Sequence, residues 1–272
     1  MSKIPKERVD VLLVERGLSE KREKAKRAIM DGTVFSNENR LEKPGEKIPI
    51  DTPLQVKGNT LKYVSRGGLK LEKALEIFDL DVTDKLMLDI GASTGGFTDC
   101  ALQNGAKHCY ALDVGYNQLA WKIRQDDRVT VMERTNFRYV TAAELTKGMP
   151  EFATIDVSFI SLKLILPVLK TLLVPGSSVI ALVKPQFEAG KDNVGKKGVV
   201  RDPKVHYSVL EKIAQFAQNE GFTLQNASFS PITGGEGNIE FLFHFIAAES
   251  EEPVYSYDQL KSLVQDAHKQ LT

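Results

Sequence analysis

The sequence has little of what builds secreted or membrane proteins. Its 272 residues include two cysteines and one tryptophan. Cys100 and Cys109 are too few for a disulfide framework, and no Cys/His cluster has the spacing of a zinc site. No apolar run approaches the roughly 18 residues of a membrane span, and the first ten residues, MSKIPKERVD, lack the apolar segment of a signal peptide. These features predict a soluble cytoplasmic protein with reduced cysteines and no bound metal.

The chain also lacks a net charge, because 36 Lys and Arg residues balance 36 Asp and Glu residues. A neutral sum argues against nonspecific binding to nucleic acid, but the charges are unevenly distributed. The stretch 19–30 contains five basic residues and only two glutamates. Such a local basic surface is typical of contacts with RNA phosphates. The predicted RNA-binding residues here are Lys21, Arg22, Lys24, Lys26 and Arg27.

Changes in periodicity divide the chain into a small and a large domain. The small one begins with two predicted helices and continues with short strands and tight turns over 33–56. The first helix ends at Gly17; the second has Ser19 as its N-cap, Ala25, Ile29 and Met30 facing inward, and Gly32 at its end. The predicted small domain is 1–58, the predicted linker is 59–64, and the predicted large domain is 65–272.

The large domain alternates strand-like and helix-like segments, which is typical of a doubly wound α/β fold. We predict helices at 68–78, 161–173 and 203–219. Seven strands with a helix before the first favour the class I methyltransferase version of this sheet, in which the last strand is antiparallel. The predicted strands are 86–90, 109–113, 129–133, 154–157, 178–183, 223–230 and 240–246.

The strongest cofactor motif is LDIGASTGGFTD at 88–99, where a strand delivers a glycine-rich turn that opens a helix. Asp113 follows at the end of the next strand, where a carboxylate can bind a ribose diol. A glycine-rich turn alone is often only a tight junction, and dinucleotide dehydrogenases share the topology. The spacing differs from G-x-G-x-x-G, and Asp89 suits a cationic methionine group, so S-adenosylmethionine is favoured over NAD. The predicted cofactor-binding residues are Asp89, Gly91, Ala92, Ser93, Gly95, Gly96, Phe97 and Asp113.

Four ionisable residues are expected to converge on the carboxyl edge of the sheet, where open α/β sheets bind ligands. They are Lys70, Asp156, Lys184 and Glu240. Each taken singly has an alternative interpretation as a surface charge or a strand-end ion pair. A lysine can remove a hydroxyl proton only when it is neutral, whereas neighbouring carboxylates favour its charged form, and the sequence leaves open which effect prevails.

The segments SRGGLKLEKAL, LDIGASTGGFTD, TIDVSFISL, VKPQFE and GGEGNIEFL closely resemble the TlyA family. This resemblance covers nearly the whole chain. It implies an N-terminal alpha-L RNA-binding domain followed by an FtsJ-like methyltransferase domain that methylates the 2'-hydroxyl of cytidine in ribosomal RNA or ribosomal subunits. It also implies a catalytic tetrad of Lys70, Asp156, Lys184 and Glu240. The segment SNENR at 36–40 departs from the Val-Asn-Gly turn of many alpha-L domains.

The segment after Lys184, residues 186–202, is rich in glycine and in basic residues. It is either a solvated loop or a lid that orders on RNA, and its position beside the predicted site favours the lid. The basic residues that we expect to contact phosphates are Lys191, Lys196, Lys197 and Arg201.

Two other functions remain alternatives at this point. Members of the family are sometimes called haemolysins, which suggests a membrane-active protein, but the sequence has no long apolar segment. A catalytically inactive RNA-binding protein is the other alternative. The intact glycine-rich turn and the complete tetrad argue against it.

Overall fold

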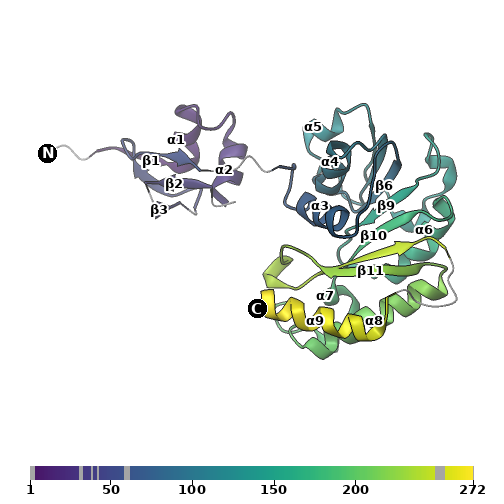
Figure 1. Cartoon of the computed structure of the whole chain (residues 1–272). Coiled ribbons are helices and arrows are strands. Elements are labelled where there is room, and N and C mark those ends of the chain that lie inside the picture. The colour runs from purple at the N-terminus through teal and green to yellow at the C-terminus, as the bar shows by residue number, and fades with distance from the viewer. Residues whose placement is uncertain are drawn as a thin grey trace. The chain divides into compact units, whose positions relative to one another are not determined.

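The computed structural model describes residues 4–30, 33–37, 39–41, 43–57, 62–248 and 255–271. The chain divides into two compact units, 1–62 and 63–272, which appear with their elements labelled in Figure 1. Tyr63 and Val64, which the predicted linker includes, belong to the large unit. The predicted helix end at Gly32 and the linker residues 59–61 lie outside the described residues.

The small unit packs two helices, α1 (Val9–Glu15) and α2 (Arg22–Met30), against short strands. A strand that the sequence analysis did not predict, β1, pairs antiparallel with β4, while β2 lies between β3 and β5. Apolar side chains of both helices and of β2 are fully buried between them. The described strands are β1 (Lys6–Arg8), β2 (Val34–Ser36), β3 (Asn39–Arg40), β4 (Lys47–Pro49) and β5 (Gln55–Val56).

Two details of the predicted second helix are wrong. The hydroxyl of Ser19 donates to the carbonyl of Lys21, and the helix begins only at Arg22, so Ser19 does not cap it. Met30 is 65% exposed, whereas Ile29 is fully buried. Successive residues of a helix point about 100° apart, so a residue next to Ile29 leaves the buried face.

The large unit contains a seven-stranded sheet in the order β11-β12-β10-β9-β6-β7-β8. All neighbouring pairs are parallel except those of β12, which runs antiparallel to β10 and β11. This confirms the predicted fold class. The strands are β6 (Leu86–Ile90), β7 (His108–Leu112), β8 (Val129–Met132), β9 (Phe152–Ile155), β10 (Ser178–Val183), β11 (Thr223–Phe229) and β12 (Phe241–Ile246).

Some strands end earlier than predicted, and this moves site residues into the loops beyond them. β7 ends one residue before Asp113, and β9 ends one residue before Asp156. Lys184 directly follows β10, which has its predicted bounds, and Glu240 directly precedes β12, which begins one residue later than predicted. The carboxyl edge of the sheet therefore carries these four side chains on residues just beyond the strands rather than within the ladder itself: Asp113, Asp156, Lys184 and Glu240.

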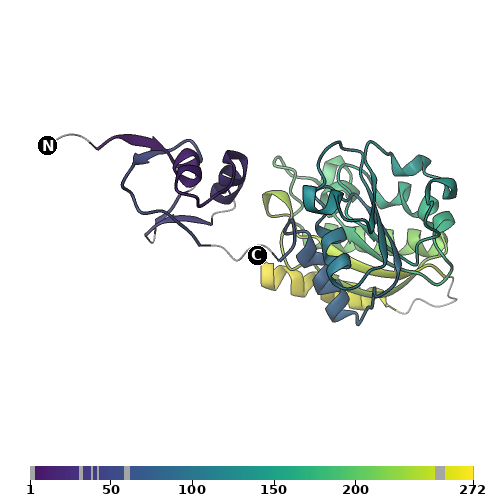
Figure 2. The same ribbon diagram turned by 90° about the horizontal axis from the view of Figure 1, so that it is seen from above.

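Helices cover both faces of the sheet, as Figure 1 and the turned view in Figure 2 show. The described residues form two main hydrophobic cores, one on each face of the sheet. In one, every second strand residue packs against α3 and α4, and in the other the intervening strand residues pack against α6, α8 and α9. Period-two alternation explains this division, because neighbouring strand residues point to opposite faces. The helices are α3 (Gly68–Ile77), α4 (Gly96–Gln103), α5 (Trp121–Arg124), α6 (Leu166–Leu172), α7 (Pro185–Glu188), α8 (Pro203–Asn219) and α9 (Tyr257–Leu271).

Two segments differ from their predicted form. The helix expected at 161–173 splits into a 3-10 turn (Leu162–Leu164) and α6, with Pro167 in the first turn of α6. Proline lacks the N–H that a continuous helix would require there, so it starts a new helix instead. The segment expected as a loop at 186–202 contains most of α7 and a 3-10 turn (Lys191–Asn193).

His244 is buried in the sheet in its neutral form. Its Nδ1 lies 3.3 Å from the Nδ2 of Asn226, which donates to it, and its Nε2 lies 3.2 Å from the hydroxyl of Ser178. Burial lowers the pKa of His244 to about 4. If Nδ1 were protonated, its hydrogen would face the amide hydrogens of Asn226, and the hydrogen bond from Asn226 to Nδ1 would be lost.

We expect His244→Gln to reduce the loss of stability at acidic pH. In wild type the unfolded chain binds a proton at this histidine below its ordinary pKa of about 6.5, while the folded chain resists it until about pH 4, so stability falls as the pH falls through that window. Asp89, whose pKa burial raises to about 6, acts in the opposite direction in both proteins and cancels in the comparison. Urea unfolding from pH 7 to 4 measures the effect. The two slopes should differ by about 1.4 kcal/mol per pH unit, and parallel curves would contradict the assignment.

Candidate active site

The glycine-rich segment passes from β6 to α4 in a backbone conformation that residues other than glycine rarely adopt. Gly91 has φ +87° and Gly95 has φ +94°. A methyl group on Gly91 would lie 2.4 Å from the carbonyl oxygen of Asp156, and one on Gly96 would lie 2.3 Å from the hydroxyl of Ser65. The turn therefore packs tightly against two neighbouring segments and leaves its backbone exposed on the remaining side.

That backbone lines a cavity of about 730 Å³ at the carboxyl edge of the sheet. Its volume lies within the range of small-molecule sites. The cavity brings together predicted residues from distant parts of the large unit. Those that line it are Lys70, Gly91, Ala92, Ser93, Gly96, Phe97, Asp156, Lys184, Lys197 and Glu240.

The four ionisable residues form one continuous run of ion pairs. Lys184 Nζ lies 2.5 Å from Asp156 Oδ1, and Lys70 Nζ lies 3.5 Å from Asp156 Oδ2. Lys70 Nζ also lies 2.8 Å from Glu240 Oε2. Two lysines and two carboxylates alternate in this order, so the run is formally neutral. Because α3, the segments after β9 and β10, and the residue before β12 each contribute one member, only the folded sheet can assemble it.

Lys70 is a charged member of this run. Its side chain is buried, and burial lowers the pKa of Lys70, but the negative charges of Asp156 and Glu240 raise it by more, so the pKa lies above the ordinary value. Lys70 is therefore an ammonium at neutral pH. It holds two carboxylates in place and does not accept a proton.

Asp89 does not face the cavity, contrary to the prediction that it contacts the cofactor. It is fully buried, and its carboxylate accepts hydrogen bonds from the amide and hydroxyl of Thr98 and from the hydroxyl of Thr154. Burial raises its pKa to about 6. Side chains of a strand point alternately to the two faces of the sheet, and that of Asp89 points into the core beneath α4. Through its hydrogen bonds to Thr98, Asp89 therefore joins α4 to the sheet.

Asp113 lies beside the glycine-rich turn without lining the cavity itself. Its Oδ2 accepts the amide hydrogen of Ser93 at 2.7 Å, and its Oδ1 accepts that of Gly115 at 2.7 Å. Each oxygen keeps a second lone pair, and the side chain is half-buried. Asp113 therefore fixes the shape of the turn. Gly95 also lies outside the lining, because it packs against Leu119 and Ile123.

Sequence reasoning missed several residues that line the cavity. Phe159 is 90% exposed with φ +63°, and its ring lies 4.9 Å from that of Phe187. Ser158 accepts a hydrogen bond from Lys184 Nζ at 3.1 Å. Gln186 lies 3.4 Å from Glu240 through its amide nitrogen. Phe159, Ser158 and Gln186 all belong to the motifs around Asp156 and Lys184, so their proximity to the tetrad in sequence was the available signal.

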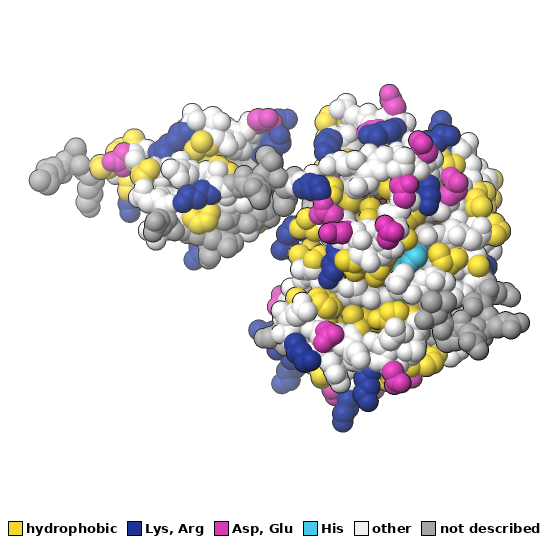
Figure 3. Space-filling model, in the orientation of Figure 1, with side chains coloured by type: hydrophobic (Ala, Val, Ile, Leu, Met, Phe, Trp, Pro, Cys, Tyr) yellow, Lys and Arg dark blue, Asp and Glu magenta, His cyan; other side chains and the backbone are white. Residues whose placement is uncertain are grey.

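The basic residues of the segment after α7 are exposed, and they do not all lie together. Lys197 lines the main cavity. Lys196, Lys197 and Arg201 also border a second depression of about 320 Å³, whereas Lys191 borders neither. On the face of the large unit drawn in Figure 3, acidic and basic side chains are interspersed. On this face, recognition of an anion must therefore rely on such local groups.

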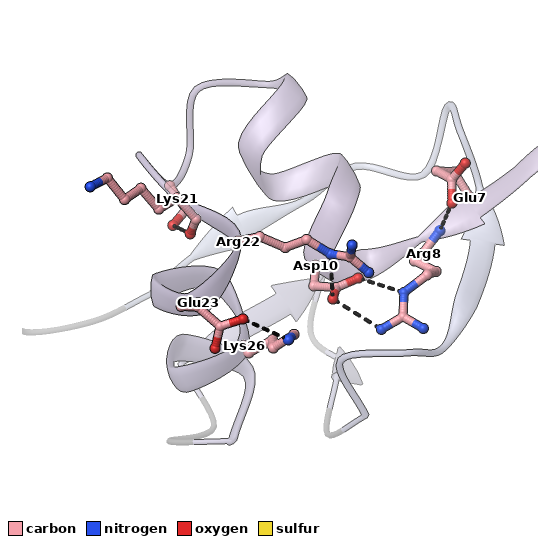
Figure 4. A network of polar contacts seen from close by, with 8 residues as sticks. Glu7, Arg8, Asp10, Lys21, Arg22, Glu23 and Lys26 are labelled. Carbon is pink, nitrogen blue, oxygen red and sulfur yellow. Dashed lines mark hydrogen bonds and ion pairs between the residues drawn. The ribbon is translucent and has the colours of Figure 1, made fainter.

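The five basic residues predicted to bind RNA in the small unit differ in their partners. Arg22 points toward the buried Asp10, as does Arg8, which Figure 4 shows from close by. Lys24 pairs with Glu20 at 2.6 Å and Lys26 with Glu23 at 2.7 Å. Lys21 and Arg27 are exposed and form no salt bridge with another described residue. These two are the cations most available to an external anion.

Comparison with known families agrees with the division into two units. Residues 63–246 match the model of the FtsJ-like methyltransferase family, and residues 7–51 match the model of the S4 domain. In the part of the chain that the structure describes, no helix has both the length and the apolar character to cross a membrane.

Three similar proteins span most of the chain. YqxC of Bacillus subtilis, named as a candidate rRNA methyltransferase, is 69% identical over 268 residues, which cover 98% of this chain and 95% of that protein. The 16S/23S rRNA (cytidine-2'-O)-methyltransferase TlyA of Mycobacterium tuberculosis is 43% identical over 235 residues, 86% of this chain and 87% of that protein. A solved structure from Streptococcus thermophilus, titled as a candidate haemolysin, is 56% identical with a TM-score of 0.78 and covers 98% of this chain and 97% of its own.

Proposed function

The chain belongs to the FtsJ-like methyltransferase family, and on that premise we propose that it transfers a methyl group from S-adenosylmethionine to the 2'-hydroxyl of cytidine in ribosomal RNA. The observation that carries this proposal is the run of ion pairs through Lys70, Asp156, Lys184 and Glu240, in one cavity with the glycine-rich turn. The names of the relatives in Bacillus subtilis and Mycobacterium tuberculosis supply the substrate class. We expect it to act in the cytoplasm on ribosomal RNA or ribosomal subunits.

The residues around the glycine-rich turn fit S-adenosylmethionine. Gly91, Ala92, Ser93 and Gly96 line the cavity, and the tight packing at Gly91 leaves no room for a side chain. We propose that this backbone approaches the methionine part, and that the free lone pairs of Asp113 accept hydrogen bonds from the ribose diol. The cofactor, when bound, supplies an electrophilic methyl group on a positively charged sulfur.

Lys184 is the side chain that we propose to meet the target hydroxyl. A ribose hydroxyl is a weak nucleophile until its proton is being removed. Two of the three hydrogen-bonding directions of Lys184 Nζ are occupied by Asp156 and Ser158, which leaves the third for the substrate. Lys70, held as an ammonium, fixes Asp156 and Glu240, and Asp156 in turn orients Lys184. We propose that Lys184 accepts the hydroxyl proton through its lone pair when it is neutral, and that it steers the hydroxyl by a hydrogen bond when it is an ammonium.

The proposed function is tested by following a labelled methyl group from S-adenosylmethionine into ribosomal RNA from cells that lack this protein. Digestion to nucleosides and mass spectrometry should then find 2'-O-methylcytidine. Label on a base, or no label in RNA or in isolated subunits, would exclude the proposal. Mapping the modified nucleotide identifies the target for the experiments below.

We expect Lys21 and Arg27, which form no salt bridge with another described residue, to contribute more to RNA binding than the paired Lys24 and Lys26. Each phosphate contact releases a counterion, so the doubly substituted Lys21→Ala, Arg27→Ala protein should lower the magnitude of the slope of log K against log salt by about 1.4 to 1.8. Lys24→Ala, Lys26→Ala is the matched control, because Glu20 and Glu23 already neutralise these lysines. Filter-binding titrations between about 50 and 200 mM salt, the range over which this effect is large, measure both slopes. Equal slopes in the two variants would show that pairing does not decide which cations contact RNA.

A further inference from the structure

Gln186 carries a buried hydrogen-bond acceptor without a donor. Its side-chain oxygen Oε1 has no hydrogen-bond partner, and it is the one such buried side-chain atom among the described residues. Buried polar atoms in folded proteins are nearly always satisfied, because an unmade hydrogen bond costs the desolvation of the group. Gln186 lines the cavity that holds the tetrad. Because Oε1 itself has almost no exposed surface, a small turn of the Gln186 side chain into the cavity brings this unpaired acceptor to a donor on a ligand.

The orientation of the amide is determined by Glu240. The amide nitrogen Nε2 of Gln186 donates to Glu240 Oε1 at 3.4 Å. Rotating the amide by 180° would place its oxygen against that carboxylate oxygen and would bury two amide hydrogens without an acceptor. Glu240 is itself held by Lys70 through its other oxygen, at 2.8 Å. The run of alternating charges therefore ends on Gln186 and leaves its oxygen, not its nitrogen, as the open group.

The ribose of an internal RNA nucleotide offers one hydrogen-bond donor. Its 3'-oxygen and 5'-oxygen are esterified to phosphates, so only the 2'-hydroxyl carries a hydrogen. In the proposed function this hydroxyl enters the cavity beside Lys184, two residues before Gln186 in the chain. A hydroxyl that accepts from Lys184 in its ammonium form still needs an acceptor for its own hydrogen, which a lysine ammonium cannot supply. Each carboxylate oxygen of Asp156 and Glu240 already has a donor, whereas the oxygen of Gln186 has none.

We propose that Gln186 Oε1 accepts the hydrogen bond of the target 2'-hydroxyl and thereby orients a lone pair of that oxygen toward the methyl donor. This inference rests on the proposed function. An amide oxygen is a very weak base, so Gln186 directs the O–H bond and does not remove the proton, which leaves to neutral Lys184 or to solvent as the new bond between the oxygen and the methyl carbon forms. No bond is made or broken at Gln186. Its part in the reaction is to hold the nucleophile in the geometry from which displacement proceeds.

Gln186→Met tests the proposal, because methionine keeps the length of the side chain but not the amide. We expect the single-turnover rate to fall by roughly 10- to 100-fold, with little change in the Kd for S-adenosylmethionine or RNA. Ser161→Ala serves as a control, because Ser161 bonds Glu188 of the same helix α7 and does not line the cavity.

A chemical double-mutant cycle identifies the donor. The probe is a synthetic rRNA fragment that wild type methylates, made with either a 2'-hydroxyl or a 2'-fluoro group at the target, since fluorine cannot donate. With S-adenosylhomocysteine present, wild type should bind the hydroxyl form about fivefold more tightly, and Gln186→Met should bind the two forms equally. The same preference in both proteins would overturn the proposal.

Three further outcomes would also overturn it, each in a distinguishable way. A loss of affinity for S-adenosylmethionine in Gln186→Met would assign the open acceptor to the cofactor. A changed preference between cytidine and uridine at the target would assign it to the amino group of the base. Equal rates in Gln186→Met and wild type would leave the acceptor without a part in transfer. Absence of 2'-O-methylation by wild type would instead refute the proposed function itself.

Discussion

Lys184→Arg is expected to lose methyl transfer by about 10² to 10⁴, the usual contribution of general acid-base catalysis, although it keeps the positive charge. Arginine does not release its proton at accessible pH, and its planar guanidinium cannot reproduce the three-way geometry of the ammonium between Asp156, Ser158 and the substrate. Lys184→Ala should lose activity to a similar extent. Binding of S-adenosylmethionine and RNA should change little in both proteins, since the glycine-rich turn and the small unit are untouched.

Single-turnover rates measured against pH distinguish proton removal from a purely electrostatic contribution. Wild type should show a rate that rises as one group loses its proton, and the arginine variant should lack this rise. Lys73→Arg is the matched control, because Lys73 lies on the same helix as Lys70 but does not line the cavity. If Lys184→Arg retained near-normal rates, Lys184 would not take the proton, and solvent or a carboxylate would have to do so.

Gly91→Ala is expected to lower the affinity for S-adenosylmethionine by more than about tenfold and to reduce methyl transfer further. The added methyl group would lie 2.4 Å from the carbonyl oxygen of Asp156, so either the turn or the Asp156 segment must move. The φ of +87° adds a strain of roughly 1–2 kcal/mol for any residue with a side chain. Because Asp156 pairs with both lysines, its displacement also disturbs the tetrad.

Gly176→Ala separates the collision from the backbone strain. Gly176 has φ +83°, and a methyl group there would meet nothing within 4 Å. Both variants therefore pay a similar backbone cost, but only Gly91→Ala alters the cavity. Isothermal titration with S-adenosylmethionine and thermal unfolding measure the two effects. The assignment of the turn to the cofactor would be wrong if Gly91→Ala bound it as tightly as Gly176→Ala.

The sequence predicted the sheet well because each strand is a short apolar run bounded by turn residues. β6 and β10 have the predicted bounds, and the other five strands differ at their ends by one or two residues. Such end differences arise because hydrogen bonding to a neighbour, and not the apolar pattern, determines where a strand ends. The interruption of the helix at Pro167 follows from the missing N–H of proline, and the exposure of Met30 follows from the roughly 100° step between successive helix residues.

The sequence by itself determined the two-domain division, the order and type of the strands, the glycine-rich turn and the identity of the four ionisable residues. These features depend on local periodicity and on motifs, which a single chain displays in its order of residues. The tertiary structure alone decided which charges pair, because Lys70 and Glu240 are 170 residues apart and meet only when α3 packs beside β12. It also buried Asp89 against Thr98 and Thr154, and it left the oxygen of Gln186 without a donor. Whether a buried polar atom finds a hydrogen-bond partner depends on all the segments that surround it in the folded chain. The sequence of any one segment therefore does not show it.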